Sequence, residues 1–85
     1  MLLAVDIGNT NIVCGLFAED RLVTTFRLES TQRRTSDEQA AQIAQMSPLR
    51  GIDPQAIKAS ILASVEPQLT DVVTHAIEDI IGKVP

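Results

Sequence analysis

The stretch AVDIGNTNIVCGLF, residues 4–17, contains the residues whose types and spacing could perform chemistry. Asp6 ends an apolar run, where a carboxylate is costly unless it is paired or bound to a cation. Gly8 comes two positions later, before three small hydrogen-bonding residues: Asn9, Thr10 and Asn11. This pattern is compatible with either a tight hairpin turn or a loop that binds phosphate.

The hairpin interpretation rests on Gly8-Asn9, because both residues tolerate the positive φ angles that tight hairpin turns require. Taken alone, these two residues favour a plain turn. Thr10 and Asn11, however, extend the loop beyond what a turn needs. A plain turn also does not explain why an acid, Asp6, ends the apolar run.

The phosphate-loop interpretation uses each of these residues. Gly8 permits close backbone approach, and the consecutive N–H groups of residues 8–11 can form an anion-binding concavity. The Thr10 hydroxyl and the neighbouring amides can donate further hydrogen bonds. Asp6 would then hold Mg²⁺, directly or through water, because Mg²⁺ prefers oxygen ligands and is commonly shared between carboxylates and phosphates.

Other residues with chemical potential have simpler explanations. Arg33-Arg34 is predicted to be a solvated surface pair. His75, the only histidine, has no Cys or His at ligand spacing, and Cys14 is predicted to be a core residue of a strand. Ser64, near the end of the fourth predicted strand, is a weak candidate to approach a binding cleft.

Composition restricts the class of protein further. A chain of 85 residues forms one small domain at most, and its net charge of −4 with no basic stripe argues against nucleic acid as a partner. A single cysteine fits a reducing compartment. The N-terminus MLLAVDIG lacks a basic n-region and meets an acid early, so we expect no signal peptide, no membrane span and a cytoplasmic location.

The elements that must position the loop follow from hydrophobic periodicity. Strands are expected over residues 2–7, 11–18, 22–29 and 59–65, with the first three joined as antiparallel hairpins by short links. A helix capped by Thr35 or Ser36 should reach about Met46, and Pro54 should begin one helical turn. An amphipathic helix should run from Pro67 to Gly82.

The predicted order is β-β-β-α-β-α, in which residues 59–65 have the nearly continuous apolar pattern of a parallel strand covered on both faces. Without a fifth strand, this apolar strand would lie at an edge of the sheet. We therefore expect the chain to be the front part of something larger.

Three segments taken together match a known family pattern: DIGNTN at residues 6–11, RRTSDE at 33–38 and ASVEP at 63–67. With them, nearly the whole chain resembles the N-terminal part of type III pantothenate kinase, in the actin, Hsp70 and sugar-kinase superfamily. Related sugar kinases usually have a second glycine in the loop and Hsp70-like members have threonines. The residues Asn9-Thr10-Asn11 therefore indicate the pantothenate branch.

The resemblance implies an α/β, RNase H-like (actin-like ATPase) fold of two similar domains, with residues 1–85 as an incomplete first domain. It implies transfer of the γ-phosphate of ATP to pantothenate, giving 4'-phosphopantothenate in the first step of coenzyme A synthesis. The implied phosphate-binding residues are Asp6, Ile7, Gly8, Asn9, Thr10, Asn11, Ile12 and Val13. Asp6 is also the implied metal ligand. Family members use Mg²⁺ and a monovalent cation (K⁺ or NH₄⁺), and they are homodimers with the active site between their domains.

The chain also departs from the family pattern. The family's catalytic base is an aspartate in a Gly-Ala-Asp-Arg motif, which is absent here, so we expect no catalytic residue in this chain and no transfer by the chain alone. Gln39 stands where an aromatic residue is frequent, and Glu66 where an apolar one is common.

Two hypotheses follow. The first is that the chain is the ATP-phosphate-binding segment of a pantothenate kinase. The alternative is a non-catalytic interaction module that pairs with another chain through its exposed fourth strand.

Overall fold

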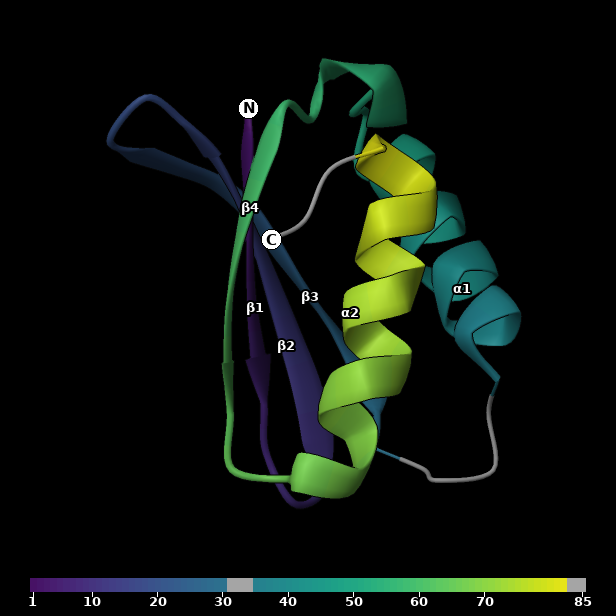
Figure 1. Ribbon diagram of the computed structural model, residues 1–85. Helices are drawn as coiled ribbons and strands as arrows, with labels where there is room; N and C mark the ends of the chain where they lie inside the picture. The colour runs from purple at the N-terminus through teal and green to yellow at the C-terminus, as the bar shows by residue number, and fades with distance from the viewer. Residues whose placement is uncertain (31–34, 83–85) are drawn as a thin grey trace.

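The protein folds into a four-stranded sheet and two helices, as the computed structural model of residues 1–30 and 35–82 describes (Figure 1). Its elements are β1 (Leu2–Ile7), β2 (Asn11–Ala18), β3 (Arg21–Glu29), α1 (Ser36–Leu49), a 3₁₀ turn (Pro54–Ala56), β4 (Ala59–Ser64) and α2 (Pro67–Ile81). This order is the one that the sequence predicts, and the strand bounds differ from the predicted ones by one residue at Arg21 and at Val65. The α/β class is therefore confirmed.

The strands lie in the order β3-β2-β1-β4. The first three strands pair antiparallel because their links are too short for a crossover, whereas β4 returns parallel to β1 after α1. The prediction that β4 lies at a sheet edge is confirmed. Within residues 1–30 and 35–82, neither helix is long and apolar enough to cross a membrane.

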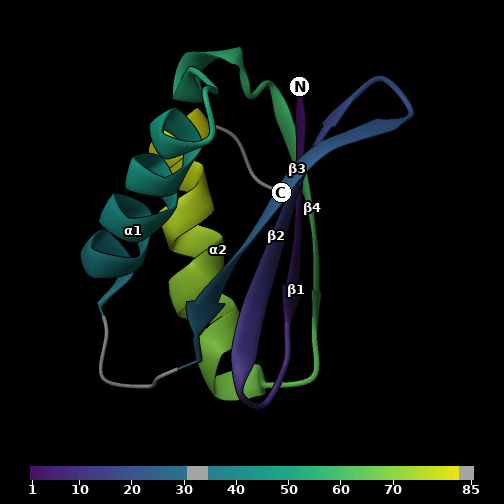
Figure 2. The same ribbon diagram turned by 180° about the vertical axis from the view of Figure 1, so that it is seen from behind.

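Both helices cover the same face of the sheet (Figures 1 and 2). The prediction that β4 is covered on both faces is therefore wrong, and Ile61 in this strand is 59% exposed. An apolar run is typical of a strand buried on two sides, but here the second face has no helix over it in the described part of the chain. We call this surface the open face of the sheet.

The core lies between the other face of the sheet and the two helices. Alternate residues of each strand point toward it, as expected from the two-residue period of a strand. From the helices, the apolar stripe of α2 supplies most of the remaining contacts. The buried core residues include Leu3, Val5, Ile7, Ile12, Cys14, Leu16, Phe26, Ile43, Leu69, Val73 and Ile77.

The helix ends follow the predicted signals. Thr35 caps α1, since its Oγ1 accepts a hydrogen bond from the Glu38 N–H at 3.2 Å while Glu38 Oε1 accepts one from the Thr35 N–H at 3.1 Å. Gly82 ends α2 in a left-handed conformation with φ 72°. The helix α1 ends at Leu49, beyond the predicted Met46, and includes Pro48 in its last turn.

Gln39 is the one buried polar side chain in the described part of α1. It is 0% exposed, and among the residues that the structure describes neither its Nε2 nor its Oε1 has a hydrogen-bond partner. A buried carboxamide without partners loses its hydrogen bonds to water and receives none in return. Gln39, which stands where the family often has an aromatic residue, therefore destabilises the core in which it is buried.

We expect Gln39→Met to raise the free energy of unfolding by about 1–2 kcal/mol, because an unbranched apolar side chain removes the unpaired amide without leaving a large gap. Urea unfolding followed by circular dichroism measures this change. Gln45→Met is the matched control, because Gln45 lies on the same helix but is exposed. Its effect should stay within about 0.5 kcal/mol. A less stable Gln39→Met variant would contradict the prediction.

Candidate functional site

The loop between β1 and β2 is a short hairpin connection. The Gly8 N–H donates to the Asn11 carbonyl at 2.9 Å, which closes the loop. The expected positive φ angles are absent, because among the described residues only Glu19, Gly51 and Gly82 have them. Gly8 serves a different purpose here, since a Cβ at this position would lie 3.2 Å from the Asn11 carbonyl oxygen. Lack of space rather than backbone rotation therefore favours glycine.

Ser30 supports this loop and was not among the predicted site residues. Its hydroxyl donates to the Gly8 carbonyl at 2.9 Å, and its N–H donates to the Thr10 carbonyl at 3.0 Å. These two hydrogen bonds hold the end of β3 against the loop between β1 and β2. The only sequence signal for this role is that Ser30 is a hydroxyl residue directly after the third predicted strand.

The loop has three polar side chains, Asn9, Thr10 and Asn11, and all three are exposed. The Asn11 side-chain amide donates to the Thr10 hydroxyl at 3.2 Å, so these two side chains lie together. Because the Gly8 N–H is already used within the loop, only the N–H groups that follow it are candidates for an incoming anion. Ile7 and Ile12, at the two ends of the loop, have their side chains in the core and offer only backbone groups.

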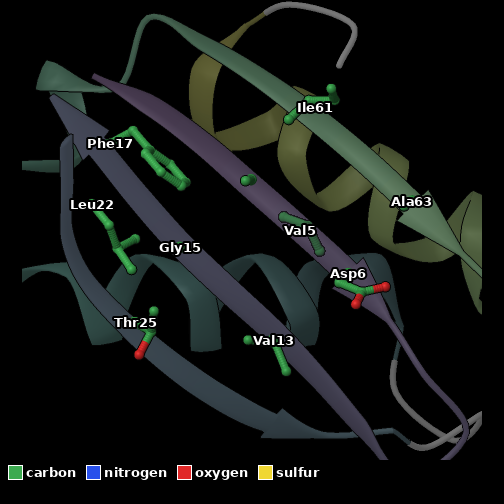
Figure 3. Close-up of a pocket in the computed structure, with 10 residues that line it drawn as sticks. Val5, Asp6, Val13, Gly15, Phe17, Leu22, Thr25, Ile61 and Ala63 are labelled. Atoms are coloured by element: carbon green, nitrogen blue, oxygen red, sulfur yellow. The ribbon is translucent and has the colours of Figure 1, made fainter. Parts of the chain in front are cut away.

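Asp6 lies on the open face, beside Val13 on β2 and Ala63 on β4 (Figure 3). Its side chain is exposed. The argument that an acid in this apolar strand must be costly is therefore wrong, since alternation turns Asp6 away from the core. No group of three His, Cys, Asp or Glu side chains forms within the described residues, so Mg²⁺ at Asp6 would need phosphate and water for its other ligands.

The carboxyl ends of β1 and β4 meet at the same edge of the sheet, because the two strands are parallel. The Val65 N–H donates to the Ile7 carbonyl at 3.0 Å, which brings the start of α2 beside the loop (Figure 1). Ligands of open α/β sheets bind at this kind of edge. The predicted loop therefore lies where such a sheet commonly has its binding site.

Ser64, the weak cleft candidate, has a structural role at this edge. Its Oγ accepts hydrogen bonds from the Glu66 N–H at 3.0 Å and from the Thr70 hydroxyl at 2.9 Å. These contacts hold the first turn of α2 against the end of β4. The hydroxyl of Ser64 is thus already engaged by its own chain.

The remaining candidates lie away from the loop or outside the described residues. Nδ1 of His75, an exposed side chain on α2, lies 2.7 Å from the Asp71 carbonyl oxygen. Cys14 is buried and unpaired, and burial raises the pKa of its thiol to about 12. Arg33 and Arg34 lie outside the residues that the structure describes.

Comparison with known proteins gives a consistent family. A family model described as type III pantothenate kinase matches residues 2–85. A type III pantothenate kinase of Moorella thermoacetica is 42% identical over 85 residues, covering 100% of this chain and 34% of the relative. One of Myxococcus xanthus is 48% identical over 69 residues, covering 81% and 27%. The chain spans about a third of the length of these curated relatives.

Proposed function

The chain belongs to the type III pantothenate kinase family, and we propose that it carries the ATP-phosphate-binding loop of such a kinase. The observation that supports this most is the place of residues 8–11, at the carboxyl end of β1 beside the start of α2. There, the backbone N–H groups after Gly8 and the side chains of Thr10 and Asn11 can face a phosphate group.

The proposed reaction of the whole protein is ATP-dependent phosphorylation of pantothenate. In it, the loop would hold the phosphates of ATP and Asp6 would hold Mg²⁺, directly or through water. Bound Mg²⁺ would neutralise charge on the transferring phosphoryl group. The acid that accepts the pantothenate proton is expected outside these 85 residues, because the Gly-Ala-Asp-Arg motif is absent from them. Homodimer formation and a requirement for K⁺ or NH₄⁺ belong to the same proposal.

We further propose that the sheet is the incomplete first domain of an RNase H-like fold. The order β3-β2-β1-β4, with three antiparallel strands and a parallel fourth, supports this topology. The share of its relatives' length that the chain spans, 34% and 27%, supports an incomplete domain.

A chimera tests the proposed function. Residues 1–85 would replace the matched third of the Moorella thermoacetica relative, to which they are 42% identical. We expect the purified chimera to release ADP from Mg·ATP only when pantothenate is present. The remaining two thirds of the relative, produced without any first third, is the control and should release none.

A folded chimera that binds neither Mg·ATP nor pantothenate would contradict the proposal, because the transplanted loop would then be inert in the setting that its relatives provide. That result would favour the alternative, a non-catalytic module that pairs through the edge of β4.

A further inference from the structure

The hairpin loop between β1 and β2 makes only one of the two backbone hydrogen bonds that its ends can exchange. Gly8 and Asn11 stand at the two ends of the turn, and the Gly8 N–H donates to the Asn11 carbonyl at 2.9 Å. The return bond, from the Asn11 N–H to the Gly8 carbonyl, is the one that commonly closes a four-residue turn. It is not made within the described part of the chain, where residues 9–10 form a bend without it.

The Gly8 carbonyl is bound by Ser30 instead. The Ser30 hydroxyl, at the end of β3, donates to this carbonyl at 2.9 Å in a partly buried position. The Ser30 N–H donates to the Thr10 carbonyl at 3.0 Å. A single residue therefore holds two carbonyl groups of the loop on the same side, toward β3.

The direction of these two carbonyls fixes the direction of the N–H groups that follow them. A trans peptide group is planar and points its C=O and its N–H to opposite sides, and no peptide bond is cis among the described residues. The Asn9 N–H and the Asn11 N–H therefore point away from Ser30. Successive N–H groups that are free of neighbouring carbonyl oxygens can form an anion-binding concavity.

We propose that Ser30 is a positioning residue of the phosphate loop. Its hydroxyl keeps the Gly8 carbonyl from pairing with the Asn11 N–H, so that the Asn9 and Asn11 N–H groups stay available to a phosphate group. The inference rests on the proposed function, since it takes the nucleotide phosphate as the ligand of the loop. Ser30 acts through the backbone and contributes by holding the loop in its binding conformation before the anion arrives.

Loss of the Ser30 hydroxyl should close the loop. In Ser30→Ala the backbone N–H can still donate to the Thr10 carbonyl, so the end of β3 stays beside the loop. The Gly8 carbonyl, however, becomes a partly buried acceptor without its donor. The Asn11 N–H, at the other end of the turn, then completes the closing bond and is lost to the phosphate.

Amide hydrogen exchange tests this change in the 85-residue chain without nucleotide. We expect the Asn11 amide of Ser30→Ala to exchange about two- to tenfold more slowly than that of the wild type, because it gains a hydrogen bond. Ser30→Thr keeps the hydroxyl and should exchange like the wild type. Ser30→Cys keeps the size of the side chain with a weaker donor, and should change exchange in the same direction as Ser30→Ala but by less.

Isothermal titration of the chimera tests the consequence for binding. Ser30→Ala should lower the affinity for Mg·ATP about three- to tenfold and leave the affinity for pantothenate unchanged, while Ser30→Thr should restore Mg·ATP binding.

Thr70→Ala is the matched control for the titration. The Thr70 hydroxyl also makes two hydrogen bonds at this edge of the sheet, to the Ser64 hydroxyl at 2.9 Å and to the Glu66 carbonyl at 3.3 Å, but it holds α2 rather than the loop. Its loss should lower stability and leave the affinity for Mg·ATP unchanged. Circular dichroism verifies that each variant is folded.

Three results overturn the inference while the proposed function stands. They are a Ser30→Ala chimera that binds Mg·ATP like the wild type, Asn11 exchange that does not respond to Ser30→Ala, and equal losses of affinity in Ser30→Ala and Ser30→Thr. A folded wild-type chimera that binds no Mg·ATP overturns the proposed function and, with it, the positioning role. Because the exchange measurement needs no nucleotide, it distinguishes a wrong account of the loop from a wrong ligand.

Discussion

Replacing Asp6 with asparagine is expected to lower the affinity for Mg·ATP by about 10- to 100-fold, which corresponds to about 1.4–2.8 kcal/mol. The expected cause is loss of the carboxylate that holds Mg²⁺ against the phosphates, since interactions with a charged group are worth about 1.5–3 kcal/mol. Folding should change little, because Asp6 is exposed and an exposed substitution usually shifts stability by less than about 0.5 kcal/mol. Isothermal titration, in the isolated chain or in the chimera, measures the affinity.

Magnesium dependence separates this effect from a general charge effect. In EDTA, the Asp6→Asn variant should bind ATP at least as well as the wild type, because a carboxylate beside unshielded phosphates repels them. Asp20→Asn is the control, since Asp20 is an exposed acid in the turn between β2 and β3. Unchanged Mg·ATP affinity together with a lower melting temperature would show that Asp6 serves the fold and not the nucleotide.

Alkaline pH is expected to destabilise the protein through Cys14. Burial raises the pKa of this thiol from its ordinary value of 9.0 to about 12. The unfolded chain therefore releases a proton near pH 9 that the folded chain retains, so stability falls as pH rises between about 9 and 12. At about 1.4 kcal/mol per pH unit, the loss reaches about 2–3 kcal/mol by pH 11.

Urea unfolding at pH 8 and pH 11 measures this loss. The chain contains no tyrosine, whose phenol would otherwise titrate in this pH range. Cys14→Ala should be less stable than the wild type at pH 8 because it leaves a gap in the core, but its stability should decline less toward pH 11. Equal declines in the two proteins would mean that Cys14 is not the responsible group.

The fold could be predicted largely from local patterns. Alternation located the strands, the Thr35 and Glu38 pair located the start of α1, and the spacing of Leu69, Val73 and Ile77 located α2. Short links fixed the antiparallel hairpins, because a parallel crossover needs more residues. Each of these signals acts between residues close in sequence, where a single chain gives enough information.

The wrong predictions concern which segments cover each face of the sheet and which residues distant in sequence come into contact. Nothing local indicates that α1 and α2 lie on the same side of the sheet, so the two-sided burial expected for β4 and the buried environment expected for Asp6 were wrong. Ser30 was missed because its contact with Gly8 joins residues 22 positions apart. Gly8 was predicted correctly as a loop residue, but for its φ angle or for close approach to a phosphate rather than for its closeness to the Asn11 carbonyl.

The parallel pairing of β1 with β4 has a consequence for synthesis on the ribosome. Leu2 pairs with Ala59, 57 residues later, so the second edge of β1 has no strand beside it until most of the chain has been made. At translation rates of about 5–20 residues per second, this delay is roughly 3–11 s. The β1-β2-β3 meander must pass through that interval with an unpaired edge, which exposes it to aggregation until β4 has been made.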